Sequence, residues 1–157
     1  MSAEQAFGHR QNYRTTRAEY FGALVVAAAA FLWHIGDVRW GPAILLFVYI
    51  DVIGYIPGLI AFSLSKDGRI HPVFHVLYNV MHTWLSAGVV VLLWAWLVGP
   101  EWALLVVPIH LFGDRGLLGN YTKPISEPFE HFETARQKAF HAARQADAAR
   151  QTEVQAA

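Results

Sequence analysis

Histidine and aspartate side chains recur within the apolar segments in the middle of this chain, where other charged residues are rare. Asp51 stands inside one apolar run, His75 and His82 inside the next, and His110 and Asp114 inside the last. Imidazole nitrogens and carboxylate oxygens are ligands for zinc, iron and manganese, and together they offset the charge of a divalent ion. The sequence therefore predicts a site for a divalent metal (Zn, Fe or Mn), with the ligands Asp51, His75, His82, His110 and Asp114. The alternative is a hydrogen-bonded polar core without metal, in which Asp51 pairs with Arg115 or a histidine.

The same segments carry residues that could support catalysis around such a metal. A divalent ion in a dry site can activate a bound water near neutral pH. Asn79 and Tyr55 could orient a substrate, and the guanidinium of Arg115 could hold an anionic group. The predicted catalytic residues are Asp51, Tyr55, Asn79 and Arg115.

The composition predicts that these residues belong to a membrane protein. Of the 157 residues, 55% are hydrophobic and only 15% are charged, and the mean hydropathy is +0.30 although both ends are polar. Soluble domains usually carry about a quarter charged residues, and a soluble domain of this length could not bury so much apolar surface. The 12 basic and 12 acidic residues cancel, which argues against nucleic acid as a partner. The absence of cysteine excludes disulfides and thiolate ligands.

Four apolar segments that are long enough, or nearly long enough, to cross a bilayer alternate with polar stretches. The predicted spans are residues 19–36, 42–64, 72–98 and 101–118. They make up a transmembrane domain over 18–123, between a polar segment at 1–17 and a helical tail at 124–157 whose helix starts near Ser126. We therefore predict an all-α fold, a polytopic membrane four-helix bundle with an additional C-terminal helix.

The placement of lysine and arginine predicts the orientation of this bundle. Basic residues gather in the N-terminal segment, in the loop between the second and third spans and after the fourth span, whereas the other side holds only Arg39. By the positive-inside rule, both termini and the tail are cytoplasmic. The predicted location is the bacterial inner membrane, with the lipid bilayer as partner and a homodimer or a membrane complex as the expected assembly.

Helix geometry predicts that the ionisable residues meet at a similar depth. At 1.5 Å per residue, Asp51 lies about 13 Å into its span, near the middle of a hydrocarbon core of about 30 Å. His82 lies about 16 Å into the next span, on a polar stripe with His75. His110 and Asp114 are one turn apart and can face one point. An ionisable side chain in hydrocarbon costs about 3 kcal/mol, so we expect these groups to be partnered.

Three short patterns carry a resemblance. They are D-x-x-G-Y from Asp51 to Tyr55, Y-N-x-x-H from Tyr78 to His82, and H-x-x-x-D-R from His110 to Arg115. Over residues 20–123, the chain resembles an uncharacterised family of small bacterial four-helix integral membrane proteins, known as a domain of unknown function. The resemblance implies the fold and the topology, and it implies no particular reaction.

Several function classes remain open at this level. The first is a metal-dependent membrane enzyme, a hydrolase or an oxidoreductase, that acts on a lipid-like or other hydrophobic substrate. The second is a metal-free cyclase or isomerase, in which Asp51 and a histidine carry out acid–base chemistry. The third is a non-catalytic binding, transport or accessory subunit of a membrane complex, including one that binds haem through His82 with His75 or His110.

Overall fold

The computed structural model describes residues 10–156, which fold into helices joined by short connections and contain no strand. In chain order the helices are α2 (Arg10–Trp33), α3 (Trp40–Gly54), α4 (Ile56–Leu64), α5 (Pro72–Met81), α6 (Trp84–Leu97), α7 (Val106–Phe112) and α8 (Ala135–Ala156). Short 3-10 turns cover Ile35–Asp37 and Trp102–Leu105, and a π-helical turn covers Gly113–Leu118. The prediction of an all-α fold is confirmed. Most of the predicted N-terminal segment 1–17 lies outside the described residues.

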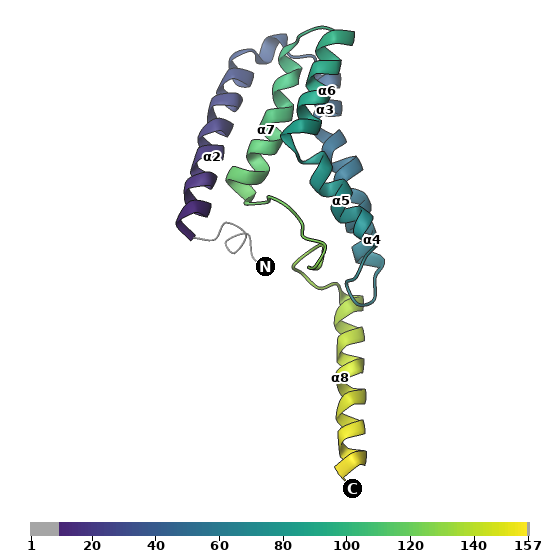
Figure 1. The fold of residues 1–157 in the computed structure, drawn as a ribbon. Coiled ribbons are helices and arrows are strands. Elements are labelled where there is room, and N and C mark those ends of the chain that lie inside the picture. Colours follow the sequence, from purple (N-terminus) through teal and green to yellow (C-terminus); the bar gives the residue numbers. More distant parts are fainter. Residues whose placement is uncertain (1–9, 157) are drawn as a thin grey trace.

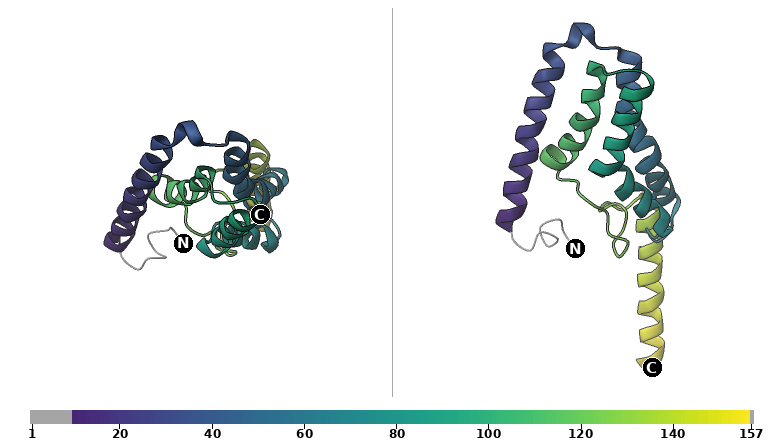
Figure 2. Two further views of the ribbon diagram at one scale, coloured as in Figure 1. Left: turned by 90° about the horizontal axis from the view of Figure 1, so that it is seen from above. Right: turned by 45° about the horizontal axis from the view of Figure 1, so that its top comes forward.

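The helices α2 to α7 lie alongside one another as a bundle, and α8 projects from one end of it (Figure 1). The start of α2 and the start of α8 are at the same end, as both Figure 1 and the tilted view of Figure 2 show. Helix α2 packs closely on the π-helical turn, because a Cβ atom at Gly116 would lie 2.5 Å from the backbone nitrogen of Phe21. Buried side chains of α3, α6 and α7, including Ile50, Ala87 and Leu111, form the main core.

Helices α3 and α4 together form the segment that best fits a membrane span. Trp40–Leu64 has 25 residues and contains an 18-residue stretch with a mean hydropathy of 2.1, so it is long and apolar enough to cross a bilayer. Helices α5 and α6 meet the same condition only as a pair, because a bend of 56° separates them. Within residues 10–156, one helix could thus cross a membrane by itself, or two if the bent pair counts as one span. The four-span topology stays a prediction.

The predicted span 72–98 is broken at His82, where α5 ends and α6 begins. Thr83 is the N-cap of α6, and its Oγ1 accepts a hydrogen bond from the backbone nitrogen of Ser86 at 3.1 Å. The hydroxyl of Ser86 donates to the carbonyl oxygen of Val80 at 2.6 Å, which satisfies an acceptor at the end of α5. Thr83 is thus an N-cap inside an apolar run, and the new helix start places His82 at a corner of the chain.

The segment between the π-helical turn and α8, residues 119–134, is irregular and is called the strap below. Helix α8 begins at Ala135 and not near Ser126, which corrects the predicted start of the tail helix. Pro128 disfavours a helix that starts at Ser126, since proline disfavours helical geometry in the residue before it. Instead the strap folds back on the bundle. Its Phe129 is 1% exposed and packs against Gly58, where a Cβ atom would overlap its ring.

Candidate metal site

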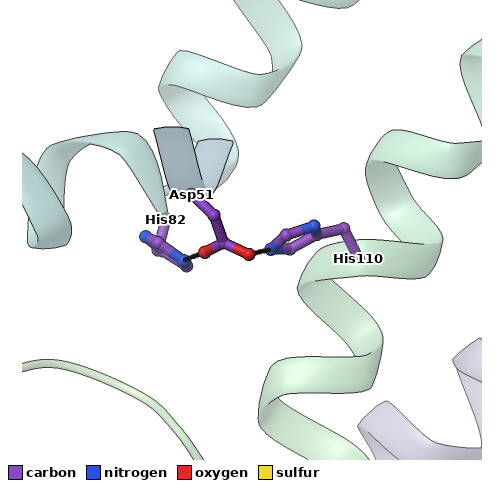
Figure 3. A group of neighbouring side chains, drawn as sticks. All are labelled: Asp51, His82 and His110. Carbon is purple, nitrogen blue, oxygen red and sulfur yellow. Dashed lines mark ion pairs between the residues drawn. The ribbon is translucent and has the colours of Figure 1, made fainter. Parts of the chain in front are cut away.

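Three ionisable side chains from different helices meet in the middle of the bundle. The carboxylate of Asp51, on α3, lies between two imidazole rings (Figure 3). Its Oδ1 is 3.4 Å from Nε2 of His82, and its Oδ2 is 3.6 Å from Nε2 of His110. Both rings are buried, and one ligand atom from each of the three residues lies within 4.8 Å of the others. Asp51, His82 and His110 therefore form a group that could hold a metal ion.

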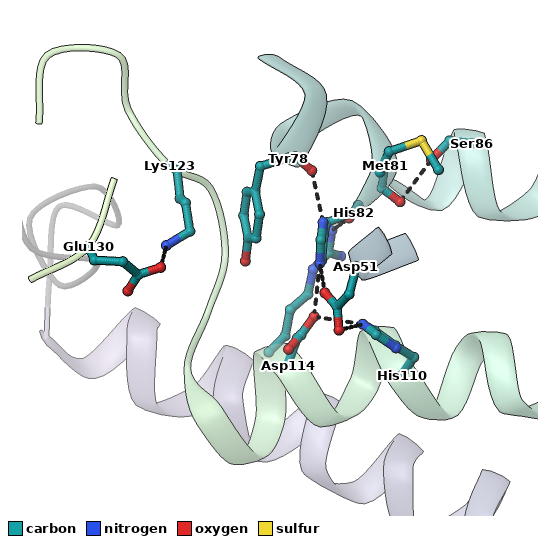
Figure 4. A network of polar contacts seen from close by, with 10 residues as sticks. Asp51, Tyr78, Met81, His82, Ser86, His110, Asp114, Lys123 and Glu130 are labelled. Atoms are coloured by element: carbon teal, nitrogen blue, oxygen red, sulfur yellow. Dashed lines mark hydrogen bonds and ion pairs between the residues drawn. The ribbon is translucent and has the colours of Figure 1, made fainter. Parts of the chain in front are cut away.

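Asp114 adds a second carboxylate to this group. It stands in the π-helical turn, four residues after His110, and its Oδ2 lies 3.4 Å from Nε2 of His110 and 3.4 Å from Nε2 of His82 (Figure 4). The structure thus brings together four of the five residues predicted as metal ligands. We call Asp51, His82, His110 and Asp114 the metal group.

The spacing within the metal group differs from that of ordinary hydrogen bonds. Its nitrogen–oxygen distances run from 3.4 to 3.6 Å, whereas direct N–H···O bonds measure about 2.7–3.2 Å. Two ligand atoms that are each about 2.1 Å from a tetrahedral zinc ion are separated by about 3.4 Å. The four distances are therefore longer than direct hydrogen bonds, and each is compatible with a cation between the nitrogen and the oxygen.

The orientation of the His82 ring supports the same interpretation. Its Nδ1 lies 2.9 Å from the carbonyl oxygen of Tyr78, and because a carbonyl only accepts, Nδ1 must carry the proton. In a neutral ring, Nε2 then presents its lone pair to the carboxylates of Asp51 and Asp114. Lone pairs facing one another repel, so the arrangement requires either a second proton on the ring or a metal ion between the groups. A backbone carbonyl on the other ring nitrogen is the usual way in which proteins orient a metal-binding histidine.

The close approach of α3 and α5 depends on Gly54. A Cβ atom at this position would lie 2.8 Å from Cβ of Met81. Asp51 precedes Gly54 by one helical turn, and His82 directly follows Met81, so the same contact sets the distance between these two ligands. A small residue at a helix crossing permits this approach, as is common in membrane helices.

Arg115 fixes the backbone at the corner where His82 stands. Its guanidinium donates hydrogen bonds to the carbonyl oxygen of His82 and to the hydroxyl of Tyr20 on α2, each at 2.8 Å. The same group lies over the rings of Tyr20 and Trp84. These contacts make Arg115 a positioning residue, and the predicted role in holding an anionic group would require it to leave them.

The structure does not bring His75 to the metal group. Its Nε2 lies 3.2 Å from the carbonyl oxygen of Glu127 in the strap, and its ring packs edge-on against Phe129. His75 and His82 share a helix face in the sequence pattern, but seven residues separate them by about 10 Å along the axis. The helix also ends at Met81. His75 is therefore an anchor for the strap and not a fifth ligand.

A cavity of about 210 Å³ lies against the metal group on the side of the strap. Three members of the metal group line it, Asp51, His82 and Asp114, together with Tyr55 and Tyr78. The side chain of Asp51 is 41% exposed, whereas the two histidine rings are almost fully buried. The metal group is thus closed on the side of the rings and open on the side of the cavity, as a catalytic metal site must be to admit water or substrate.

The far wall of this cavity consists of strap residues that the sequence pattern does not predict as part of a site. Nζ of Lys123 donates to Oε1 of Glu130 at 3.0 Å and to the carbonyl oxygen of Phe129 at 2.7 Å. The ammonium also lies 4.6–5.6 Å from the ring centres of Phe129, Tyr78 and Tyr55. The ion pair with Glu130 lies within the strap, whereas the cation–π contacts with Tyr55 and Tyr78 hold the strap against the helices. In the sequence, Lys123 and Glu130 resemble ordinary charges outside a span.

Asn79 anchors the strap and does not face the metal group. Its Nδ2 donates to the carbonyl oxygen of Lys123 at 3.0 Å, and its Oδ1 accepts from the backbone nitrogen of Lys123 at 2.7 Å. The amide thereby satisfies both backbone groups of one strap residue. Of the predicted catalytic residues, Asp51 belongs to the metal group and Tyr55 lines the cavity, while Asn79 and Arg115 hold the surrounding backbone.

Comparisons of this chain with models of protein families, with curated proteins and with solved structures found no match. The resemblance to the four-helix family of unknown function therefore stays a prediction. The function has to follow from the metal group, the cavity beside it and the apolar surface of the bundle.

Proposed function

We propose that this protein is an integral membrane enzyme that depends on a divalent metal and acts on a hydrophobic, lipid-like substrate. The metal group supplies the ligands, and the cavity under the strap supplies the open position. The observation that carries the proposal is the ring orientation of His82, whose Nε2 points at the carboxylates of Asp51 and Asp114 while Nδ1 is bound to the carbonyl oxygen of Tyr78. A metal ion among these atoms converts repulsion between lone pairs into coordination.

The membrane part of the proposal rests on the apolar surface of the bundle. Large hydrophobic side chains are exposed along α6, and Leu85 and Trp96 are each 79% exposed. Similar side chains cover the outer face of α3, including Ile44. An apolar surface of this extent favours aggregation in water and is suited to contact with lipid. We propose a multi-pass protein of the bacterial inner membrane, in which α2, α3–α4, α5–α6 and α7 with its π-helical turn cross the bilayer and both termini are cytoplasmic.

The identity of the metal decides the class of reaction. Zinc in a site of imidazole and carboxylate ligands activates a bound water or polarises a substrate oxygen, which favours hydrolysis. Iron with two histidines and a carboxylate favours oxygen-dependent oxidation. In both cases the reacting group of the substrate would lie next to Asp51 and Asp114, the two carboxylates that line the cavity.

A metal-free acid–base enzyme is the second candidate, and the same geometry favours it in a different protonation state. If the His82 ring carries two protons, its Nε2 can form ion pairs with Asp51 and Asp114 at the observed distances of 3.4 Å. Haem is less well supported, since the carboxylates of Asp51 and Asp114 lie between the two rings where the porphyrin would have to be. The presence of metal therefore separates the two candidates.

Elemental analysis of the purified protein tests the proposal. We expect about one Zn, Fe or Mn ion per chain in the wild-type protein, bound within the metal group, and loss of this metal in His82→Ala and in Asp51→Ala. His34→Ala is the matched control, because His34 stacks on Trp102 outside the metal group. A wild-type protein that remains free of metal after incubation with each ion would support the metal-free enzyme. Equal metal content in His82→Ala and His34→Ala would contradict the assigned ligands.

A further inference from the structure

A second hollow, of about 490 Å³, lies on the apolar surface between α2, α3 and α7. We call it the apolar groove. Its lining includes Ala28 and Phe31 of α2, Ile44 and Phe47 of α3, and Ile109 of α7. The side chains that line it are hydrophobic throughout, so an occupant that matches it is hydrocarbon. Its volume lies within the range of about 300–1,000 Å³ that is typical of sites for small molecules.

The apolar groove ends within one helical turn of the metal group. Phe47, which lines the groove, packs on the ring of His110 with 4.9 Å between the ring centres. Asp51 follows Phe47 by four residues on α3, and His110 directly follows Ile109 on α7. An occupant of the groove therefore has one end beside two members of the metal group.

The surroundings of the metal group are thus apolar on one side and polar on the other. The groove approaches it through Phe47, whereas the cavity under the strap adds Asn120, Lys123 and Glu130. A molecule that contacts both sides must carry a hydrocarbon chain and an oxygen-bearing polar group, since oxygen is a suitable ligand for the divalent ions considered above.

We propose, on the basis of the proposed function, that the apolar groove binds the hydrocarbon chain of a bilayer amphiphile whose oxygen-bearing head lies at the metal group. The chain enters from the lipid through the gap between α2 and α3. Its head lies where the groove meets the metal group, beside the His110 ring and Asp51. The substrate class is thus a lipid with a carboxylate, ester or phosphate group at the end of a single chain.

Photo-crosslinking in a lipid nanodisc tests this assignment. The probe is a long-chain alkyl hydroxamate that carries a diazirine in the middle of its chain, because a hydroxamate binds divalent metals through two oxygens. With metal-loaded wild-type protein we expect most adducts on the groove lining, at Phe31, Ile44 and neighbouring residues. We expect few on the exposed face of α6, at Leu85 and Leu92, which lipid also contacts.

A bulky side chain in the groove provides the matched comparison. Ala28→Trp fills the groove from α2, and we expect loss of most groove adducts with unchanged metal content. Ala29→Trp places the same side chain on the same helix at an exposed position outside the groove lining, and it should leave the adducts in place. The distribution of adducts on the wild-type protein already shows whether the probe binds in the groove or over the whole apolar surface. The test therefore holds even if Ala28→Trp does not fold.

Metal analysis of the same samples separates two kinds of failure. A metal-loaded protein with adducts spread evenly over the groove and the α6 face would overturn the groove assignment and leave the metal site intact. A protein without metal would overturn the proposed function instead. Groove adducts that persist unchanged in metal-free His82→Ala would show that the head does not depend on the metal group, which contradicts this inference.

Discussion

Nε2 of His82 lies 3.4 Å from Oδ1 of Asp51, and this contact joins two helices that are both interrupted beside it. Helix α3 ends at Gly54, one turn after Asp51, and α5 ends at Met81, directly before His82. The third segment of the site departs from α-helical geometry as well, since Asp114 stands in the π-helical turn. Breaks and π-turns within helices commonly occur at functional sites. Three of them converge here on one group of ligands.

Replacing Gly54 by alanine should weaken both the fold and the metal site. The new Cβ would lie 2.8 Å from Cβ of Met81, so α3 and α5 must move apart and Asp51 must move away from His82. We expect a loss of about 1–3 kcal/mol in the free energy of unfolding, as is typical of overpacking. Thermal unfolding in detergent and metal titration measure the two effects.

Gly88→Ala is the matched control for this substitution. Gly88 lies within α6, and a Cβ atom there would meet no heavy atom within 4 Å. We expect unchanged metal binding and a stability equal to or above that of the wild type, because alanine favours helix more than glycine does. Equal behaviour of the two variants would show that the α3–α5 contact does not set the position of Asp51.

Removing the Arg115 guanidinium should reduce metal affinity although this residue is not a ligand. Arg115→Met deletes the hydrogen bonds to the carbonyl oxygen of His82 and to the hydroxyl of Tyr20. Loss of groups that position metal ligands typically lowers metal affinity by about 10–100-fold. Tyr20→Phe removes only the contact with α2 and should have a smaller effect. Metal titration that gives the same affinity for Arg115→Met and the wild type would contradict the positioning role.

Asn79→Ala should open the strap and leave the metal group intact. The substitution removes both hydrogen bonds to the backbone of Lys123. Leaving those groups without partners costs about 1–3 kcal/mol, which corresponds to roughly tenfold to hundredfold faster amide exchange at Lys123 if the strap opens locally. Hydrogen–deuterium exchange measures this rate, and Asn120→Ala, on the same strap, is the control. Unchanged exchange in Asn79→Ala would show that other contacts hold the strap.

The proposed crossing of the membrane predicts which loops share a side. The chain has no cysteine, so single cysteines can be introduced without background. Asp37→Cys should react with a membrane-impermeant maleimide from one side of sealed vesicles, and Lys66→Cys and Glu133→Cys only from the other. All three positions are exposed in the structure, so accessibility does not differ for other reasons. If the cysteines of Asp37→Cys and Lys66→Cys react from the same side, α3–α4 does not cross the membrane.

The meeting of Asp51, His82, His110 and Asp114 could be predicted from the sequence because helix geometry fixes depth. Residues near the middle of successive apolar segments lie at similar depths whatever the details of packing. His110 and Asp114 are one turn apart and share a face. Charged groups in apolar segments also require partners, which restricts where they can point.

The corner at His82 and the strap could not be predicted in the same way. The polar stripe from His75 to His82 resembles one continuous helix, and only Thr83, a residue type favoured at helix N-caps, indicates a new helix start. The strap depends on contacts between residues far apart in the sequence, such as Phe129 with Gly58 and Lys123 with Asn79. Helix periodicity contains no information on such contacts. The sequence pattern therefore predicts His75 as a metal ligand, although the residue holds the strap.

A crystal structure of the metal-loaded protein, with anomalous diffraction at the absorption edge of the bound metal, tests the central claim most directly. We predict one anomalous peak within about 2.0–2.2 Å of Nε2 of both His82 and His110 and of a carboxylate oxygen of Asp51 or Asp114. A structure of metal-treated crystals without this peak, with Nε2 of His82 moved to hydrogen-bond distance from a carboxylate, would contradict the claim and identify the group as a metal-free acid–base pair.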